Sequence, residues 1–380
     1  MRSSVKALAA TTLVASLALG SAAIGQPTGG TVVFGGATIG TPSATTTLIK
    51  QTTNSAIINW QTFSVGSGSS VVFDQPGAAA IALNRVLGGG VSQIDGSLSA
   101  NGQVWIINAN GILFGKGSQI NVAGLLATTS DIANGDFASG NYNFSSASSN
   151  PSASVDNAGT IHVGAGGSAV LSAPHVGNAG LIQADGGQIV LGGASAFTVD
   201  FDGDNLLRYQ ISTPVAVTPT DANGTPRKEL VGNGGTLSAA GGRILLTARA
   251  AANVADNVVN NTGMISANSA SVHNGEVILD AGSGTVQDSG QISATGNGAG
   301  ESGGNVALAG NSVTVADNAV IDASGDQGGG TVSIGGGLHG SGPYQSAQNT
   351  DMLGQSNRVR TDQHVAFEFE ANVAEVGVVG

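Results

Sequence analysis

The sequence contains no cysteine, little charge and few aromatic residues. Across 380 residues cysteine is absent, Asp, Glu, Lys and Arg together make up 9%, and Phe, Trp and Tyr make up 4%. The lack of cysteine excludes disulfides and thiolate metal sites, and it helps an exported chain to stay unfolded until it has crossed a second membrane. The scarcity of aromatics predicts a narrow core of stacked aliphatic side chains, as in a solenoid, rather than the broad core of a sandwich.

Long apolar runs and positive charge are scarce as well. Beyond residue 25 no uninterrupted apolar stretch approaches the ~20 residues that a transmembrane helix needs. Because charge is also low, the surface has to be polar through Gly, Ser, Thr, Asn and Gln. The net charge of −12 disfavours nucleic acid and anionic membrane surfaces as partners, since little would neutralise their phosphates.

Proline is rare and glycine is abundant, with 9 and 61 residues respectively. Glycine at this level with so little proline argues against collagen and against a proline-rich linker. The hydrophobic fraction of 41% is too high for intrinsic disorder. Val, Ile, Thr and Ser dominate over Lys, Glu and Arg, and this composition favours an all-β chain.

The first 25 residues have the features of a signal peptide. Arg2 and Lys6 form a positive start, residues 7–19 are apolar, and residues 20–23 are small. A buried N-terminal helix is the alternative. We expect cleavage between Ala22 and Gln26, so that the mature protein leaves the cytoplasm.

From about residue 155 the chain repeats one pattern. A corner of the Asn-x-Gly type leads through an aliphatic residue to a Gly pair or a single Gly and a strand with alternating aliphatic residues. A spacing of roughly 20 to 30 residues with period-two strands is typical of a β-solenoid. Residues 153–336 are therefore predicted to form β-helix coils around an aliphatic column, with positive φ at each Asn-x-Gly or Gly-Gly corner. The copies begin at Asn157, Asn178, Asn261, Asp288 and Asp317, with a partial copy at Gly234.

Two segments interrupt the repeats. Residues 131–155 are rich in Ser, Asn and aromatics, and we expect an extra-helical hairpin or loop there. Residues 197–231 hold three prolines and most of the local charge, and we expect an insertion that projects from the helix. This insertion contains Asp200, Asp202 and Asp204, but Gly203 interrupts the run and no Glu follows at the distance of a calcium loop. A solvated loop is therefore favoured over a weak calcium site.

Residues 57–132 carry the most informative blocks. They include Ile57-Ile-Asn-Trp60, Val71-Val-Phe73-Asp-Gln75-Pro76, Ile81-Ala-Leu-Asn84-Arg85-Val86, Ile94-Asp-Gly96-Ser-Leu98 and Ile120-Asn-Val122-Ala-Gly124. In their order these blocks closely resemble the secretion domain of filamentous haemagglutinin-type two-partner-secretion exoproteins. The resemblance implies a right-handed parallel β-helix with an N-terminal cap. It also implies export by an outer-membrane barrel transporter whose periplasmic POTRA domains bind this region.

On this resemblance residues 26–152 form the secretion domain, that is, the cap and the first coils. The family's Asn-Pro-Asn-Gly-Ile turn corresponds to Asn108, Ala109, Asn110, Gly111 and Ile112. Ala109 replaces the proline, so the corner is less pre-organised. Asn-Gly favours a turn in any protein, and a mainly structural role is favoured here over recognition by the transporter.

Asn84 and Arg85 are the other candidate recognition residues, because a charged residue within so neutral a stretch needs a reason. A buried polar ladder or a capping contact is favoured over direct contact with the transporter. The large aromatics of the stretch are expected to pack the cap onto the first coils rather than to form a carbohydrate-stacking platform. These aromatics are Trp60, Phe63, Phe73, Trp105 and Phe114.

Patterns for catalysis or metal binding are weak. Residues 300–304 match a nucleophile-elbow pattern around Ser302, and residues 298–303 match a dinucleotide loop, but neither has the strand-turn-helix context that its chemistry requires. The five histidines are scattered without metal-ligand spacing. No catalytic residue, metal or cofactor is predicted. A secreted β-helix enzyme acting on polysaccharide is the alternative, and the few charges on repeat strands, such as Arg243 and Glu276, speak against it.

The sequence therefore predicts a secreted, non-enzymatic exoprotein that reaches the cell surface or the medium. We expect it to adhere, through many weak contacts, to a glycan or protein on a host or neighbouring cell. An autotransporter would need its own C-terminal barrel, which residues 337–380 cannot supply. These residues are expected to be an irregular tail, and the higher charge between Arg358 and Glu375 suggests a truncated form of a longer exoprotein.

Overall fold

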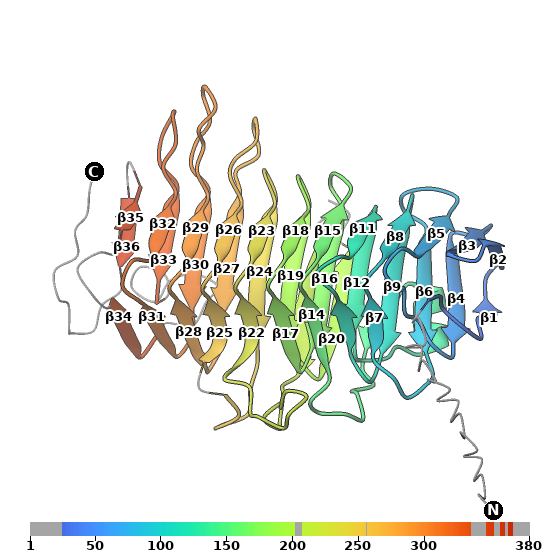
Figure 1. The fold of residues 1–380 in the computed structure, drawn as a ribbon. Helices are drawn as coiled ribbons and strands as arrows, with labels where there is room; N and C mark the ends of the chain where they lie inside the picture. Colours follow the sequence, from blue (N-terminus) through green and yellow to red (C-terminus); the bar gives the residue numbers. More distant parts are fainter. Residues whose placement is uncertain are drawn as a thin grey trace, which may run out of the picture.

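The chain folds as a parallel β-helix in a computed structural model that describes residues 25–201, 207–255, 257–335, 347–352, 358–361 and 364–367. Three long sheets form its sides, and from β7 (Ser92–Ile94) onward the chain passes in each coil through sheet 3, then sheet 2, then sheet 1. The strands of successive coils pair in parallel, so the coils lie side by side from the cap to the last coil (Figure 1). The predicted all-β parallel β-helix is confirmed.

Sheet 1 contains twelve strands in the order β1 (Thr31–Phe34), β4 (Ser55–Trp60), β6 (Ile81–Val86), β9 (Gln103–Asn108), β12 (Gly124–Thr128), β16 (Ser168–Ala173), β19 (Gln188–Gly193), β24 (Arg243–Ala248), β27 (Glu276–Asp280), β30 (Asn305–Ala309), β33 (Thr331–Ile334) and β36 (His364–Phe367). Sheet 2 contains twelve strands in the order β2 (Ala37–Ser43), β3 (Thr46–Gln51), β5 (Ser70–Asp74), β8 (Ser97–Ala100), β11 (Gln119–Val122), β15 (Thr160–Val163), β18 (Leu181–Gln183), β23 (Thr236–Ser238), β26 (Met264–Ser266), β29 (Gln291–Ser293), β32 (Val320–Asp322) and β35 (Arg358–Arg360). Sheet 3 contains nine strands in the order β7 (Ser92–Ile94), β10 (Ile112–Phe114), β14 (Ser154–Asn157), β17 (His175–Asn178), β22 (Glu229–Asn233), β25 (Asn257–Asn261), β28 (Thr285–Asp288), β31 (Ser312–Val315) and β34 (Asn349–Met352).

The inner core follows from the period-two alternation of the repeat strands. In β15, Ile161 and Val163 point inward and are buried, whereas His162 between them is exposed. Parallel pairing in register places the same inward position of every coil in one column. Each fully buried aliphatic side chain contributes about 1.5–3 kcal/mol relative to exposure. One such column in sheet 2 consists of Ile120, Ile161, Ile182, Leu237, Ile265 and Ile292.

Glycine occurs at the corners for two different physical reasons, and the sequence prediction is correct for one of them. In three Gly-Gly corners the first glycine has positive φ, 76° at Gly166, 64° at Gly186 and 66° at Gly241, whereas in the last two, at Gly303 and Gly329, it does not. In the Asn-x-Gly corners the prediction of positive φ is wrong. A Cβ added to Gly180 would lie 2.1 Å from the carbonyl oxygen of Gly159 in the preceding coil. Glycine is required there because successive coils approach too closely for any side chain.

An N-terminal cap of antiparallel strands closes the first coil. β1 pairs antiparallel with β4, and β2 pairs antiparallel with β3, whereas β4 and β3 begin the parallel ladders. Trp60 and Phe63 are fully buried at this end of the inner core, with their ring centroids 5.5 Å apart. Both the predicted cap and the predicted packing of aromatics beneath it are confirmed here.

The two interruptions of the repeats come together in an outer antiparallel sheet with the order β13 (Tyr142–Phe144), β20 (Ala196–Phe201) and β21 (Leu207–Thr213). A short helix, α1 (Asn134–Ser139), precedes β13. The predicted extra-helical hairpin is therefore confirmed. The prediction that the insertion projects from the helix is wrong for its first half, because residues 196–201 and 207–213 lie against the outer face of sheet 1. Residues 222–226 form an exposed tip.

A second hydrophobic cluster holds this outer sheet on sheet 1. Trp105 is 1% exposed and belongs to this cluster, not to the inner core beneath the cap, so its predicted position is corrected. Its ring contacts Tyr142 at a centroid distance of 4.7 Å and Phe144 at 5.9 Å. Phe144 stacks in turn on Phe197 at 4.6 Å. The outward face of sheet 1 is apolar at these positions, and covering it removes that surface from water.

The tail differs from its prediction. Three short strands, β34, β35 and β36, add in parallel to sheets 3, 2 and 1. Residues 347–352, 358–361 and 364–367 therefore continue the coils instead of forming an irregular segment. The predicted signal peptide, apart from Gly25, lies outside the described residues.

Candidate functional site

The predicted recognition turn leads the chain from β9 of sheet 1 to β10 of sheet 3. Asn108 is fully buried; its Oδ1 accepts the backbone N–H of Asn110 at 2.9 Å, and its Nδ2 donates to the Ser92 hydroxyl at 2.9 Å. The N–H of Gly111 donates to the Asn108 carbonyl at 3.0 Å, and φ of Gly111 is 113°. Ile112 follows in the inner core. These residues form a hydrogen-bonded corner that joins two successive coils.

Restoring the family's proline in this turn should stabilise the protein. Ala109 is the second residue of the four-residue turn closed by Gly111 and Asn108, the position that proline favours. We expect Ala109→Pro to raise the free energy of unfolding by about 0.5–1 kcal/mol, because the unfolded chain loses conformational freedom. Urea unfolding of the two proteins measures the difference. An equal or lower unfolding midpoint in the variant would show that the native backbone at this position does not accommodate proline.

Asn84 lies in β6, between β4 and β9 of sheet 1, and is fully buried. Its Oδ1 accepts the indole N–H of Trp60 at 2.9 Å, and its Nδ2 donates to the carbonyl of Trp105 at 3.3 Å. The side chain therefore joins three successive strands of sheet 1. Because the Asn84 side chain is 0% exposed, a transporter cannot contact it in the folded protein.

Arg85 points to the opposite face of β6 and is 8% exposed. Its Nε lies 2.8 Å from Asp131 Oδ1, its Nη1 donates to Asn134 Oδ1 at 2.8 Å, and its Nη2 donates to the carbonyl of Ile132 at 2.7 Å. The guanidinium thus fastens the start of the extra-helical segment to sheet 1. These are the buried polar contacts that the sequence favours for Asn84 and Arg85. Recognition of either side chain by a transporter would have to precede folding, and it stays a prediction.

A column of stacked polar side chains, which the sequence did not predict, runs along one corner of the helix. In four successive coils, from Asn157 to Asn261, an Asn Nδ2 donates to the side-chain Oδ1 of the next coil at 2.8 Å. The fifth copy pairs in register at Ile321 and Val332, but its first residue, Asp317, does not continue the column, because Val315 takes the position beside Asp288. An Asn at the same position of every coil would have been the signal for the column, and Asn233 was missed because the copy around it is partial. The column consists of Asn157, Asn178, Asn233, Asn261 and Asp288.

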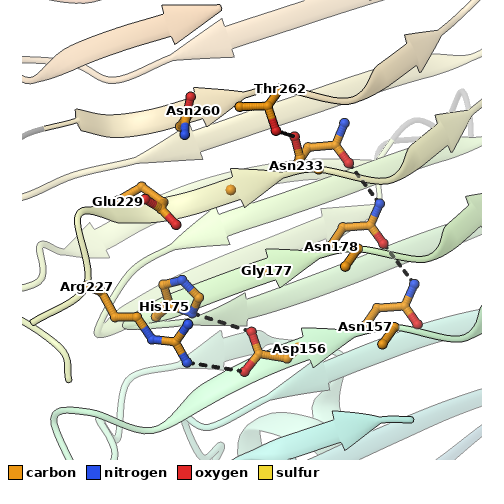
Figure 2. Close-up of a pocket in the computed structure, with 14 residues that line it drawn as sticks. Asp156, Asn157, His175, Gly177, Asn178, Arg227, Glu229, Asn233, Asn260 and Thr262 are labelled. Atoms are coloured by element: carbon orange, nitrogen blue, oxygen red, sulfur yellow. Dashed lines mark hydrogen bonds and ion pairs between the residues drawn. The ribbon is translucent and has the colours of Figure 1, made fainter. Parts of the chain in front are cut away.

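A shallow groove with a volume of about 340 Å³ lies beside this column on the outward face of sheet 3 (Figure 2). One outward row of the sheet is formed, in register, by Asp156, Gly177, Gly232 and Asn260. The two glycines leave a gap two strands wide between the carboxylate and the amide. His175, Arg227 and Glu229 line the same groove, and none of these groove residues was identified from the sequence.

Charges of both signs meet in the groove. The Nδ1 of His175 lies 3.5 Å from Asp156 Oδ1, and the Nη2 of Arg227 lies 3.9 Å from Asp156 Oδ2. Burial acts to raise the pKa of Asp156, but the neighbouring His175, the Ser154 hydroxyl and the charge of Arg227 outweigh it and leave the pKa lowered. The carboxylate is therefore ionised at neutral pH.

The described residues show no arrangement for metal binding, since no three of their His, Asp and Glu side chains are grouped to hold an ion. Asp202 and Asp204 of the carboxylate run lie outside the described residues. Ser302 of the nucleophile-like pattern is followed by β30 and not by a helix. Within the described part of the chain, no helix has the length and apolar character to cross a membrane.

Comparison with known proteins gives one consistent family. The model of the TPS (two-partner secretion) secretion domain matches residues 25–294. The heme/hemopexin-binding protein of Haemophilus influenzae is 46% identical over 112 residues, which cover 30% of this chain and 12% of that protein. The protein of the same name from strain KW20 is 46% identical over 106 residues, again 12% of its length. This chain thus matches only a small part of these curated relatives.

A solved structure agrees over most of the fold. The secretion domain of HMW1 from Haemophilus influenzae superimposes with a TM-score of 0.75 and 32% sequence identity, covering 87% of this chain and 83% of that one. The residues matched by the family model include Asn84 and Asn108. The chain belongs to the TPS secretion domain family, whose exoproteins are secreted across the outer membrane.

Proposed function

We propose that this chain is exported across the outer membrane by a POTRA-barrel partner transporter and then acts as an adhesive exoprotein, without catalysis. The match of the TPS secretion domain over residues 25–294 carries the proposal. The transporter recognises the first coils, which contain Asn84, Arg85 and the turn from Asn108 to Ile112. Because these side chains are largely internal in the folded helix, we place recognition before folding, while the chain is still extended in the periplasm.

Export is tested by expressing the chain in a Gram-negative host with and without its candidate transporter. We expect the mature protein outside the cell only when the transporter is present. Export at the same level without any transporter would contradict the proposal. The purified protein should then bind cells or immobilised glycans without releasing new chain ends from polysaccharide, whereas turnover would favour the β-helix enzyme.

The role of the turn is tested by comparing two corner asparagines. Asn108→Ala removes the buried amide of the motif, whereas Asn101→Ala removes a corner amide outside the motif that bonds the backbone of Gln75 at 2.7 and 2.8 Å. We expect export to fall more in Asn108→Ala than in Asn101→Ala. Refolding of both purified variants from urea separates a recognition defect from a folding defect. Equal loss of export in the two variants would remove the special role of the motif.

A further inference from the structure

The groove on sheet 3 is a built feature and not only an irregular surface. Its floor exists because Gly177 and Gly232 interrupt an outward row whose neighbouring positions carry the side chains of Asp156 and Asn260. A Cβ on Gly177 would lie 2.6 Å from Asp156 Oδ1, so the carboxylate leans over the space that the glycine leaves. The volume of about 340 Å³ falls at the lower end of the ~300–1,000 Å³ of small-molecule sites.

Several polar atoms around the groove lack a hydrogen-bond partner within the protein. His175 is 2% exposed; its Nε2 makes no hydrogen bond, and its Nδ1 has only the Asp156 carboxylate nearby, at 3.5 Å. Arg227 Nε and Asn260 Oδ1 are also buried without a partner. Buried polar groups of proteins are almost always satisfied, and each unsatisfied one costs about 1–3 kcal/mol. Several such atoms around a single groove point to a ligand.

The chemistry of the unpaired atoms restricts the class of ligand. Arg227 Nε is a donor and needs an acceptor, Asn260 Oδ1 is an acceptor and needs a donor, and the His175 Nε2 needs a partner as well. A hydroxyl group both donates and accepts. Two carboxylates, Asp156 and Glu229, repel an anion, and the Arg227 guanidinium repels a cation, so the groove suits a neutral ligand. A neutral ligand with many hydroxyls meets all of these requirements.

We propose that the groove over Gly177 and Gly232 binds a sugar unit of a neutral glycan. Hydroxyls of the sugar donate to Asp156 and Glu229 and accept from Arg227, while small side-chain rotations bring His175 and Asn260 into contact. The floor contributes peptide planes instead of aromatic rings, so recognition is by hydrogen bonds. This inference deepens the adhesive part of the proposed function and rests on it for its biological purpose, but the binding itself does not depend on export.

Two variants remove the site in different ways. Gly232→Asn fills the gap, and φ of Gly232 lies outside the left-handed region, so the backbone accepts asparagine as it does at Asn260 in the next strand. The added Cβ would meet the flexible Glu229 side chain at 3.2 Å. Arg227→Ala removes the guanidinium. Thr314→Ala, on the same outward row two strands beyond Asn260, is the matched control.

The mature protein and the three variants are applied to an array of neutral, amino and acidic oligosaccharides, and the best neutral glycan is titrated calorimetrically. We expect binding of at least one neutral glycan, a loss of affinity of about tenfold or more in Gly232→Asn and Arg227→Ala, and no loss in Thr314→Ala. Thermal unfolding midpoints show that the variants are folded.

Three outcomes would overturn the inference. The wild type binds no neutral glycan; or Gly232→Asn binds as the wild type does; or binding is confined to acidic glycans and is displaced by inorganic phosphate, which would make the groove an anion site. All variants are expected to be exported normally. A failure of export in wild type and variants alike would count against the proposed function and leave the groove measurements unaffected.

Discussion

Asp288→Asn should make the protein more stable at neutral pH by about 3 kcal/mol, although it replaces a residue that makes hydrogen bonds. Asp288 ends the polar column, and its Oδ1 accepts the Asn261 amide at 2.8 Å and the N–H of Gly290 at 3.2 Å. Its Oδ2 is buried without a hydrogen-bond partner. The position beside it in the next coil is held by the apolar Val315. An ionised carboxylate therefore has an uncompensated oxygen in the core.

The pKa of Asp288 gives the pH range of the effect. Burial raises this pKa from 3.8 to about 6, against the lowering effect of the Asn261 amide and the Gly290 N–H. The folded state thus binds a proton more tightly than the unfolded state. The resulting stabilisation is fully present below about pH 4 and is lost as pH rises through about 6. The difference between 3.8 and about 6 corresponds to about 3 kcal/mol at ~1.4 kcal/mol per pKa unit.

Asparagine at this position stays neutral at every pH and continues the amide pattern of the column. In Asn157 the Nδ2 reaches the carbonyls of Gly159 and Leu181, both at 3.4 Å, and the amide of the variant meets the equivalent backbone. Urea unfolding between pH 4 and pH 7.5 should give similar stabilities at the acid end and a growing advantage for Asp288→Asn above it. Asp74→Asn, at an exposed position of β5, controls for the change in net charge. Parallel curves for wild type and Asp288→Asn would contradict the assignment.

Much of the β-helix could be predicted because its determinants are local and repeated. Inward positions such as Ile161 and Ile182 alternate with polar residues, and the same alternation recurs once per coil. The pattern of one coil therefore predicts the inward positions of the next. Corners such as Gly166 and Gly186 could be predicted because positive φ is a local backbone conformation that glycine adopts without strain. The blocks between residues 57 and 132 identified the family, and the resemblance to that family predicted the cap and a partner transporter.

The parts that could not be predicted depend on contacts between segments that share no local pattern. β13 pairs with β20 across more than fifty residues of sequence, with Tyr142 opposite Val199. The sequence of neither strand indicates which segment it pairs with. Glycine is required at position 180 because the carbonyl oxygen of Gly159 in the preceding coil leaves no room for a side chain. The local sequence of the turn does not indicate this contact. The groove joins Asp156, His175 and Arg227, which come from two strands and a loop. Its two glycines looked like ordinary strand or corner glycines in the sequence.

Trp105→Ala should destabilise the outer sheet by about 3–5 kcal/mol while leaving the coils folded. Trp105 lies in the outer hydrophobic cluster, and its ring contacts Phe137 at 5.8 Å, Tyr142 at 4.7 Å and Phe144 at 5.9 Å. Removing it leaves a cavity between sheet 1 and the outer sheet. The inner core has no share in this cluster, and the hydrogen bonds of β9 to β6 and β12 are made by the backbone.

Limited trypsin digestion with mass spectrometry measures the local effect, because Arg208 lies within β21 and is cleaved only when that strand opens. We expect faster cleavage after Arg208 in Trp105→Ala, with the β-sheet circular dichroism retained. Phe114→Ala is the control: Phe114 is fully buried in the inner core, so its loss should lower the unfolding midpoint of the coils without preferential cleavage in β21. If Trp105→Ala instead unfolds the whole chain in one step, the outer sheet is an integral part of the helix. In that case the Arg85 contacts to Asp131 and Asn134, which fasten the outer segment to β6, couple the two cores into one cooperative unit.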